Sequence, residues 1–231
     1  MVELTLPKGH LVGHFSVGDL IVDTGSPVSF HYGGAQTLQD GDRRFPFSRM
    51  IACPKETLDS LTGCDIAGIL GLDILKQSGL TADLKQGRLE LCCRTEDMPA
   101  DRAELGFSLY MGAYIVTDDV ALAQGGRLRK AILDTGAPVP YLSGRRSGAL
   151  EETGERYHDL SPSFGELSGC FRRGELILPT GTGQRGRSVK FGQMPALLDN
   201  FGIFDAILGV SALTDRQIAF DFVNGRVYLA L

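Results

Sequence analysis

The stretch Leu20-Ile21-Val22-Asp23-Thr24-Gly25-Ser26-Pro27 is an apolar run that ends in a carboxylate, a hydroxyl and a glycine. The same pattern returns as Ala131-Ile132-Leu133-Asp134-Thr135-Gly136-Ala137-Pro138. A buried strand that runs into an Asp-x-Gly turn is common by itself, because Asp and Gly are both turn formers. Two copies in one chain predict a duplicated structural unit.

The repeat continues after each copy. Ile69-Leu70-Gly71 is matched by Ile207-Leu208-Gly209, and residues 83–91 match residues 221–229, so both pairs are offset by 138 residues (209 − 71 and 221 − 83). The Asp-Thr-Gly copies are offset by 134 − 23 = 111 residues, so the second copy holds 138 − 111 = 27 more residues between its two motifs. We therefore expect one unit twice, with the second copy enlarged.

This pairing of motifs resembles the aspartic proteases of the pepsin and retropepsin clan, in which each half of a two-fold site supplies an Asp-Thr-Gly turn and a later apolar-apolar-Gly segment. The resemblance runs from about residue 11 to residue 231. It implies a compact, single-chain, retropepsin-like form with a mostly β, bilobal acid protease fold, an internal two-fold repeat and a few short helices. We expect an N-terminal lobe over residues 1–93, a polar linker over 94–105 and a C-terminal lobe over 106–231 with an enlarged flap region.

The resemblance makes Asp23 and Asp134 the catalytic residues. Peptide hydrolysis by this route needs two carboxylates that share one proton and hold one water: one takes a proton from the water, and the other gives its proton to the carbonyl oxygen. The hydroxyls of Thr24 and Thr135 are expected, from the family, to cross beneath the pair and lock the two turns together.

The turn glycines, Gly25 and Gly136, have no side chain and let the backbone approach the carboxylates. The next residue differs between the copies, being Ser26 in the first and Ala137 in the second. A hydroxyl that donates to a carboxylate favours its charged form. This difference predicts that Asp23 carries the charge and Asp134 the proton.

The first copy contains no glycine-rich retropepsin flap; Tyr32 is the aromatic residue within range of such a role. The longer second copy offers residues 157–167 as a hairpin with its tip near Pro162 to Gly165. We expect one principal flap, carried by the second copy, with Pro162, Phe164 and Gly165 as substrate contacts.

Local patterns predict the smaller elements. Residues 4–22 alternate as a hairpin that leads to Asp23. Residues 54–61 and 195–202 indicate short helices, with Pro at the start and Gly at the end of each. Gln86-Gly87 and Asn224-Gly225 predict hairpin turns. The four histidines, His10, His14, His31 and His158, are expected at the surface or in turns rather than as metal ligands.

Composition limits the partners. The chain has 231 residues, 43% of them apolar, and a formal net charge of −5. This charge argues against nucleic acid or an anionic membrane as a partner. No stretch approaches the ~18 apolar residues of a membrane helix. The five cysteines suggest no disulfide framework or zinc site, and the N-terminus lacks a secretory pattern, so a cytoplasmic protein without metal or cofactor is expected.

The sequence thus predicts an aspartic endopeptidase that acts on a peptide or protein substrate, complete as a monomer because both aspartates lie in one chain. Two alternatives stay open. One is a catalytically silent peptide-binding or scaffold module on the same fold. The other is a metal-dependent hydrolase that uses scattered Asp and His residues.

Overall fold

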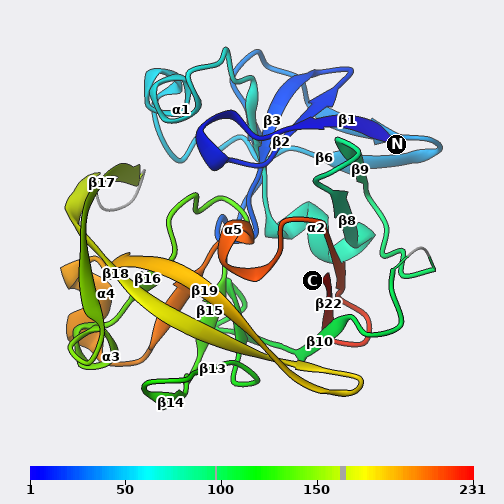
Figure 1. Cartoon of the computed structure of the whole chain (residues 1–231). Helices are drawn as coiled ribbons and strands as arrows, with labels where there is room; N and C mark the ends of the chain where they lie inside the picture. Colours follow the sequence, from blue (N-terminus) through cyan, green and yellow to red (C-terminus); the bar gives the residue numbers. More distant parts are fainter. Residues whose placement is uncertain (97, 162–164) are drawn as a thin grey trace.

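Strands are the main regular element of the computed structural model, which describes residues 1–96, 98–161 and 165–231 (Figure 1). The mostly β character expected from the sequence is confirmed. The elements of the first half (residues 1–93) are β1 (Val2–Thr5), η1 (Pro7–Gly9), β2 (Val12–Phe15), β3 (Gly18–Val22), β4 (Phe30–His31), β5 (Thr37–Asp40), β6 (Arg43–Pro46), α1 (Lys55–Thr62), β7 (Gly68–Leu70), α2 (Leu72–Ser78), β8 (Leu80–Asp83) and β9 (Arg88–Glu90).

The second half of the chain is residues 94–231. Its elements are β10 (Ala103–Gly106), β11 (Ser108–Tyr110), β12 (Tyr114–Thr117), β13 (Ala121–Leu122), β14 (Gly126–Arg127), β15 (Ala131–Leu133), β16 (Tyr141–Leu142), α3 (Gly144–Ser147), β17 (Glu151–Ser161), β18 (Gly165–Thr180), β19 (Gly183–Gln193), α4 (Ala196–Phe201), β20 (Ala206–Leu208), α5 (Val210–Leu213), β21 (Gln217–Asp221) and β22 (Arg226–Ala230). Strand β10 starts inside the segment expected as the linker.

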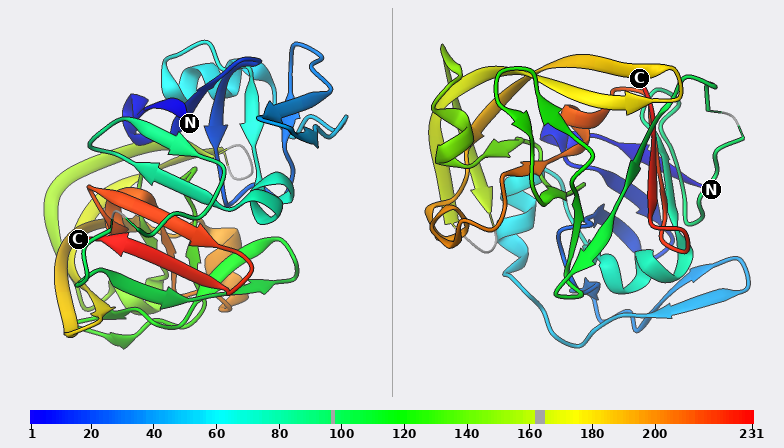
Figure 2. Two further views of the ribbon diagram at one scale, coloured as in Figure 1. Left: turned by 90° about the vertical axis from the view of Figure 1, so that its right-hand side faces the viewer. Right: turned by 90° about the horizontal axis from the view of Figure 1, so that it is seen from below.

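The last hairpin of each half joins the two halves through one sheet. Strand β8 pairs antiparallel with β21, and the hairpins β8–β9 and β21–β22 lie side by side (Figure 2, left). The register places Thr81 opposite Ala219, and 219 − 81 = 138, which is the offset of the sequence repeat. Leu80 and Ala82 accordingly face Phe220 and Ile218. The pairing is therefore two-fold about Thr81 and Ala219, as expected for two copies of one unit.

Within each half, the strand before Asp-Thr-Gly lies parallel to the strand of the later apolar motif. Strand β3 pairs with β7, and β15 pairs with β20. Parallel strands need a long crossover between them. The first half supplies this crossover through residues 23–67 and the second through residues 134–205, which is where its extra residues lie.

The short helices and turns follow the local sequence signals. Helix α1 ends at Gly63 and α4 at Gly202, and both glycines adopt positive φ, 76° and 63°, where a side chain would be strained. The hairpin turns contain Gly87 and Gly225, each with φ of 62°. The predicted helices and hairpin turns are thus confirmed.

Two hairpins distinguish the halves. The β5–β6 hairpin of the first half protrudes at one edge (Figure 2, right), with Leu38 and Phe45 buried in the core. In the second half, β17, β18 and β19 form a long antiparallel ribbon. Strand β18 alone spans Gly165–Thr180, so the ribbon reaches from the tip of the β17–β18 hairpin to strand β10.

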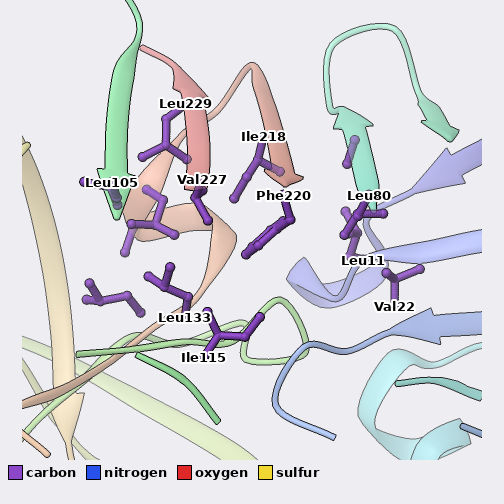
Figure 3. Close-up of a cluster of buried hydrophobic side chains, with 14 of the residues drawn as sticks. Leu11, Val22, Leu80, Leu105, Ile115, Leu133, Ile218, Phe220, Val227 and Leu229 are labelled. Carbon is purple, nitrogen blue, oxygen red and sulfur yellow. The ribbon is translucent and has the colours of Figure 1, made fainter. Parts of the chain in front are cut away.

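One apolar core underlies both halves. Side chains from the first half, including Leu11, Val22 and Leu80, pack in the same cluster as Leu133 and Ile218 of the second (Figure 3). All five side chains are fully buried. Removing a buried leucine from such a core costs about 2–5 kcal/mol. The strands that end at Asp23 and Asp134 are therefore fixed by shared packing.

Candidate active site

The two Asp-Thr-Gly turns meet at the junction of the halves. Each aspartate follows a buried strand, β3 or β15, and its main-chain N–H donates to the carbonyl oxygen of the leucine in the apolar motif. These distances are 2.9 Å from Asp23 to Leu70 and 3.0 Å from Asp134 to Leu208. Each turn thus starts at a fixed point beside its own Ile-Leu-Gly segment.

The threonines join the turns through crossed hydrogen bonds. The N–H of Thr24 donates to Oγ1 of Thr135 over 3.0 Å, and the N–H of Thr135 donates to Oγ1 of Thr24 over 2.9 Å. The two hydroxyls donate in turn to the carbonyls of Leu133 and Val22, over 2.8 and 2.7 Å. Because both threonines are buried, these four bonds are shielded from water.

The glycines bring each carboxylate against the opposite turn. The N–H of Gly25 donates to Oδ1 of Asp23 over 2.8 Å, and that of Gly136 donates to Oδ1 of Asp134 over 2.9 Å. A Cβ added at Gly25 would lie 2.5 Å from Cγ of Asp134, and one added at Gly136 would lie 2.4 Å from Cγ of Asp23. Any side chain at either glycine would therefore displace a carboxylate.

The glycines of the apolar motifs also permit close packing. A Cβ at Gly71 would lie 2.5 Å from the carbonyl oxygen of Val28, and one at Gly209 would lie 2.0 Å from that of Ala137. Both contacts are far inside van der Waals distance. The backbone of each Ile-Leu-Gly segment therefore lies directly against the loop that follows the Asp-Thr-Gly turn.

The two carboxyl groups are hydrogen-bonded to each other and titrate together. Burial raises the pKa of Asp134 well above its ordinary value, and the charge of Asp23 and the hydrogen bond with Asp23 raise it further. Burial also raises the pKa of Asp23, but the hydrogen bond from Asp134 and the N–H groups of Gly25 and Ser26 oppose that rise. In the singly protonated pair these differences favour the proton on Asp134 and the charge on Asp23.

The side chain of Ser26 does not act on the carboxylates as expected. Its hydroxyl donates to the carbonyl oxygen of Val28 over 2.9 Å, so the expectation that it donates to a carboxylate is wrong. Its main-chain N–H donates to Oδ1 of Asp23 over 3.0 Å. The turns are alike in the main chain: Ser26 and Ala137 each donate to the main-chain oxygen of their aspartate, over 3.3 and 3.2 Å, and the N–H of each also lowers the pKa of its carboxyl group. The side-chain difference between Ser26 and Ala137 is therefore not the cause of the asymmetry between the two aspartates.

A cleft of about 560 Å³ lies over the carboxylate pair, and both aspartates and both turn glycines line it. Its walls are largely apolar. Helix α1 contributes Leu58 and Leu61, and helix α4 contributes Leu198 and Phe201. Phe201 is 63% exposed, so an apolar surface continues beyond the cleft mouth. The arrangement combines two ionisable oxygens at the floor with apolar side walls.

No protein-family model matches this chain, and no curated protein sequence matches it either.

The β17–β18 hairpin closes one side of the cleft. Its strands pair as far as Ser161 opposite Gly165, and Asp159, Ser161 and Leu167 line the cleft together with the aspartates. Of the three residues of this hairpin that were expected to contact substrate, Gly165 is exposed at the start of β18 and does not line the cleft. The other two, Pro162 and Phe164, lie outside the described residues.

Tyr32 is not part of the cleft wall, which corrects the expectation that it contacts substrate. Its hydroxyl donates to the carbonyl oxygen of Cys53 over 2.8 Å, and its ring packs against Phe30 with the centroids 5.4 Å apart. Tyr32 follows strand β4 and packs against the apolar cluster that contains Leu58 and Leu61 of α1. Tyr32 instead supports the loop that carries Cys53, which does line the cleft.

Sequence reasoning did not single out four polar residues that line the cleft: His10, Tyr114, Tyr141 and Asp159. His10 is 4% exposed, so it does not lie at the surface; it directly follows the turn η1, which fits the other placement expected for it. The hydroxyl of Tyr141 donates to Oδ2 of Asp159, which joins strand β16 to the β17–β18 hairpin. Burial, followed by the neighbouring Asp159, raises the pKa of the Tyr141 phenol.

The repeat does contain a signal for His10. Val12 pairs with Ile21 and Val116 pairs with Ile132, and these two strand pairs are equivalent because 132 − 21 = 111. His10 therefore corresponds to Tyr114, two residues before each paired valine, and both line the cleft. Aligning the strands that precede the Asp-Thr-Gly turns would have identified both positions.

Two further properties concern possible ligands. Within residues 1–96, 98–161 and 165–231, no group of three or more His, Cys, Asp or Glu side chains is arranged to hold a metal ion. Across the same ranges, no helix has the length and apolar content to cross a lipid bilayer.

Proposed function

We propose that this chain is an aspartic endopeptidase of the pepsin and retropepsin type, in a compact single-chain form with two lobes. The observation that carries the proposal is the carboxylate pair of Asp23 and Asp134 at the floor of a cleft, on two Asp-Thr-Gly turns joined by crossed threonine hydrogen bonds. The lobes are residues 1–93 and 106–231, with the connection over 94–105.

The pair has the two forms that peptide hydrolysis requires. Asp23, as the carboxylate, takes a proton from a water held between the two groups while that water attacks the peptide carbonyl carbon. Asp134, as the acid, gives its proton to the carbonyl oxygen, so no free oxyanion forms. The tetrahedral intermediate then collapses: Asp23 gives the proton that it took from water to the leaving nitrogen, and Asp134 takes a proton back from a hydroxyl of the intermediate as the carbonyl forms again. The pair ends ready for another water, and a reaction of this kind uses protein side chains and water alone.

The cleft suits an extended peptide. Its apolar walls on α1 and α4 can accept apolar side chains on both sides of the cleaved bond, and the β17–β18 hairpin can exclude water above it. Both aspartates belong to one chain, so we propose a monomer as the active form. A peptide or an unfolded protein segment is the expected substrate.

The test is cleavage of a mixed peptide library from about pH 3 to about pH 8, with Asp134→Asn beside the wild type and a chelator in a parallel series. We expect turnover that survives the chelator and falls by at least about 10²- to 10⁴-fold in Asp134→Asn, the range for loss of a general acid. Asp215→Asn, at a carboxylate that is 70% exposed and outside the cleft, is the matched control and should keep full turnover.

Other outcomes reject the proposal. Peptide binding without turnover at any pH would leave a silent binding module on the same fold. Turnover that the chelator abolishes would indicate a metal-dependent hydrolase.

A further inference from the structure

His10 lies at the contact between the first half and the second Asp-Thr-Gly turn. It follows the short turn η1 and is 4% exposed. Its Nδ1 lies 2.9 Å from the carbonyl oxygen of Gly136. The neighbouring Gly9 packs so closely that an added Cβ would lie 3.1 Å from Cβ of Pro138. The hydrogen bond to Gly136 and the close approach of Gly9 to Pro138 together hold the imidazole against the second Asp-Thr-Gly turn.

This contact fixes the tautomer of the ring. A carbonyl oxygen can only accept, so the hydrogen in the bond to Gly136 must be on Nδ1. In the neutral imidazole Nε2 is then an acceptor. Burial lowers the pKa of His10, while the bond to Gly136 and the charges of Asp159 and Asp134 oppose that shift, and Lys8 favours it. The lowered pKa favours the neutral imidazole, in which Nε2 is an acceptor.

Nε2 of His10 is an acceptor in a cleft whose described lining contains no cationic donor. His10 lines the cleft beside Asp134 and Asp159, and no Lys or Arg is among the described residues that line it. An extended peptide presents its main-chain N–H groups to such acceptors, as it does when it pairs with a strand. The equivalent position in the second half is Tyr114, so the two sides of the cleft differ in what they offer to a peptide.

We propose that His10 is a substrate-positioning residue: Nδ1–H holds the carbonyl of Gly136, and Nε2 accepts a main-chain N–H of the bound peptide on the Asp134 side of the cleft. This inference rests on the proposed function, because it takes a peptide as the ligand. It gives His10 two separate tasks, one at each ring nitrogen, and two substitutions can separate them.

His10→Asn places an amide nitrogen near the position of Nδ1, so it can still donate to Gly136 but offers nothing at Nε2. His10→Gln places its amide near Nε2 instead. The matched control is His14→Asn, since His14 also uses Nδ1, toward Asp19 over 2.8 Å, but lies outside the cleft. All three are made with and without Asp134→Asn, so that binding can be measured apart from turnover.

The probe is one peptide from the mixed library, selected by cleavage, or by affinity for the Asp134→Asn protein if none is cleaved. Each of its main-chain N–H groups is replaced in turn by N-methyl, and the dissociation constant is measured for every form. We expect one position at which methylation weakens binding to the parent protein by about three- to tenfold, as for a single neutral hydrogen bond. In His10→Asn that penalty should disappear, and penalties at other positions should remain.

The outcomes separate this inference from the function on which it rests. If every methylation penalty is the same in His10→Asn as in the parent, His10 only supports the turn, and the inference is wrong even if cleavage is normal. If peptides bind with a penalty that depends on His10 but are never cleaved, the inference holds and the peptidase proposal fails. Absence of any peptide binding overturns both. His14→Asn should retain every penalty, and thermal unfolding confirms that each variant is folded.

Discussion

Replacing Thr24 by valine should show how much the hydrogen bonds between the two turns contribute to the free energy of unfolding. Valine has nearly the same shape but no hydroxyl, so it removes the bond to the carbonyl of Leu133 and the bond from the N–H of Thr135. Both partners are main-chain groups in a site where Thr24 is 0% exposed, and water cannot replace the lost hydroxyl.

The magnitude follows from those two groups. A buried polar group left without a partner costs about 1–3 kcal/mol, so Thr24→Val should lower the free energy of unfolding by about 2–6 kcal/mol. That is a large share of the about 5–15 kcal/mol that holds a typical domain together. Thr24→Ser keeps the hydroxyl and should cost no more than about 1 kcal/mol. Urea unfolding, followed by circular dichroism and fluorescence, measures these differences.

Thr62 provides a matched comparison. It is also buried and its hydroxyl also makes two bonds, to the carbonyl of Leu58 over 3.0 Å and from the N–H of Cys64 over 3.1 Å, but both are local in the chain. Thr62→Val should therefore lower stability while peptide turnover stays intact, whereas Thr24→Val should lower both. Equal loss of turnover in the two variants, or a loss of stability below about 1 kcal/mol in Thr24→Val, would refute the reasoning.

Two further predictions concern the carboxylate pair and the hairpin. The raised pKa of Asp134, caused first by burial and then by the charge of Asp23, means that stability present at low pH is lost as pH rises through that pKa. Asp134→Asn removes this linkage, so its free energy of unfolding relative to the wild type should increase with pH by up to about 1.4 kcal/mol per pH unit; a difference independent of pH would contradict it. Tyr141→Phe removes the bond to Asp159 and should speed hydrogen exchange in β17 and raise KM by about three- to tenfold. Tyr228→Phe, a control outside the cleft, should change neither, and unchanged exchange in Tyr141→Phe would show that the bond does not hold the hairpin.

The sequence predicted those features that depend on local chemistry or on the repeat. Asn224-Gly225 specifies its turn because glycine alone adopts the required positive φ without strain. The repeat predicted two equivalent Asp-Thr-Gly turns, and its offset of 138 residues reappears as the register of β8 against β21, centred on Thr81 and Ala219. When two copies of one unit pair about a two-fold axis, the residues that face each other at the axis are equivalent in the repeat. The offset of 138 residues therefore describes both the sequence repeat and the strand register.

The remaining cleft residues depend on contacts between segments far apart in the chain. His10 is 126 residues from Gly136, and neither residue type indicates by itself that the imidazole is buried there. Ser26 shows a related limit, since its residue type does not indicate that its hydroxyl donates to the carbonyl of Val28 and not to a carboxylate. Tyr32 lies near Asp23 along the chain, but its hydroxyl is bonded to the carbonyl of Cys53, 21 residues further on, instead of facing the cleft.

Duplication by itself would give two carboxylates in equal surroundings, yet the proposed reaction needs one acid and one base. The surroundings differ in ways that favour this division. Asp23 accepts N–H groups from both Gly25 and Ser26, which stabilises its charge. The 27 residues added to the second copy belong to the half that carries Asp134, and the hairpin built there lines the same cleft. Burial raises the pKa of both carboxyl groups and therefore does not separate them. The charge of Asp23 and the hydrogen bond between the two groups raise the pKa of Asp134, whereas the same bond lowers that of Asp23, so the contact between the carboxyl groups favours the proton on Asp134.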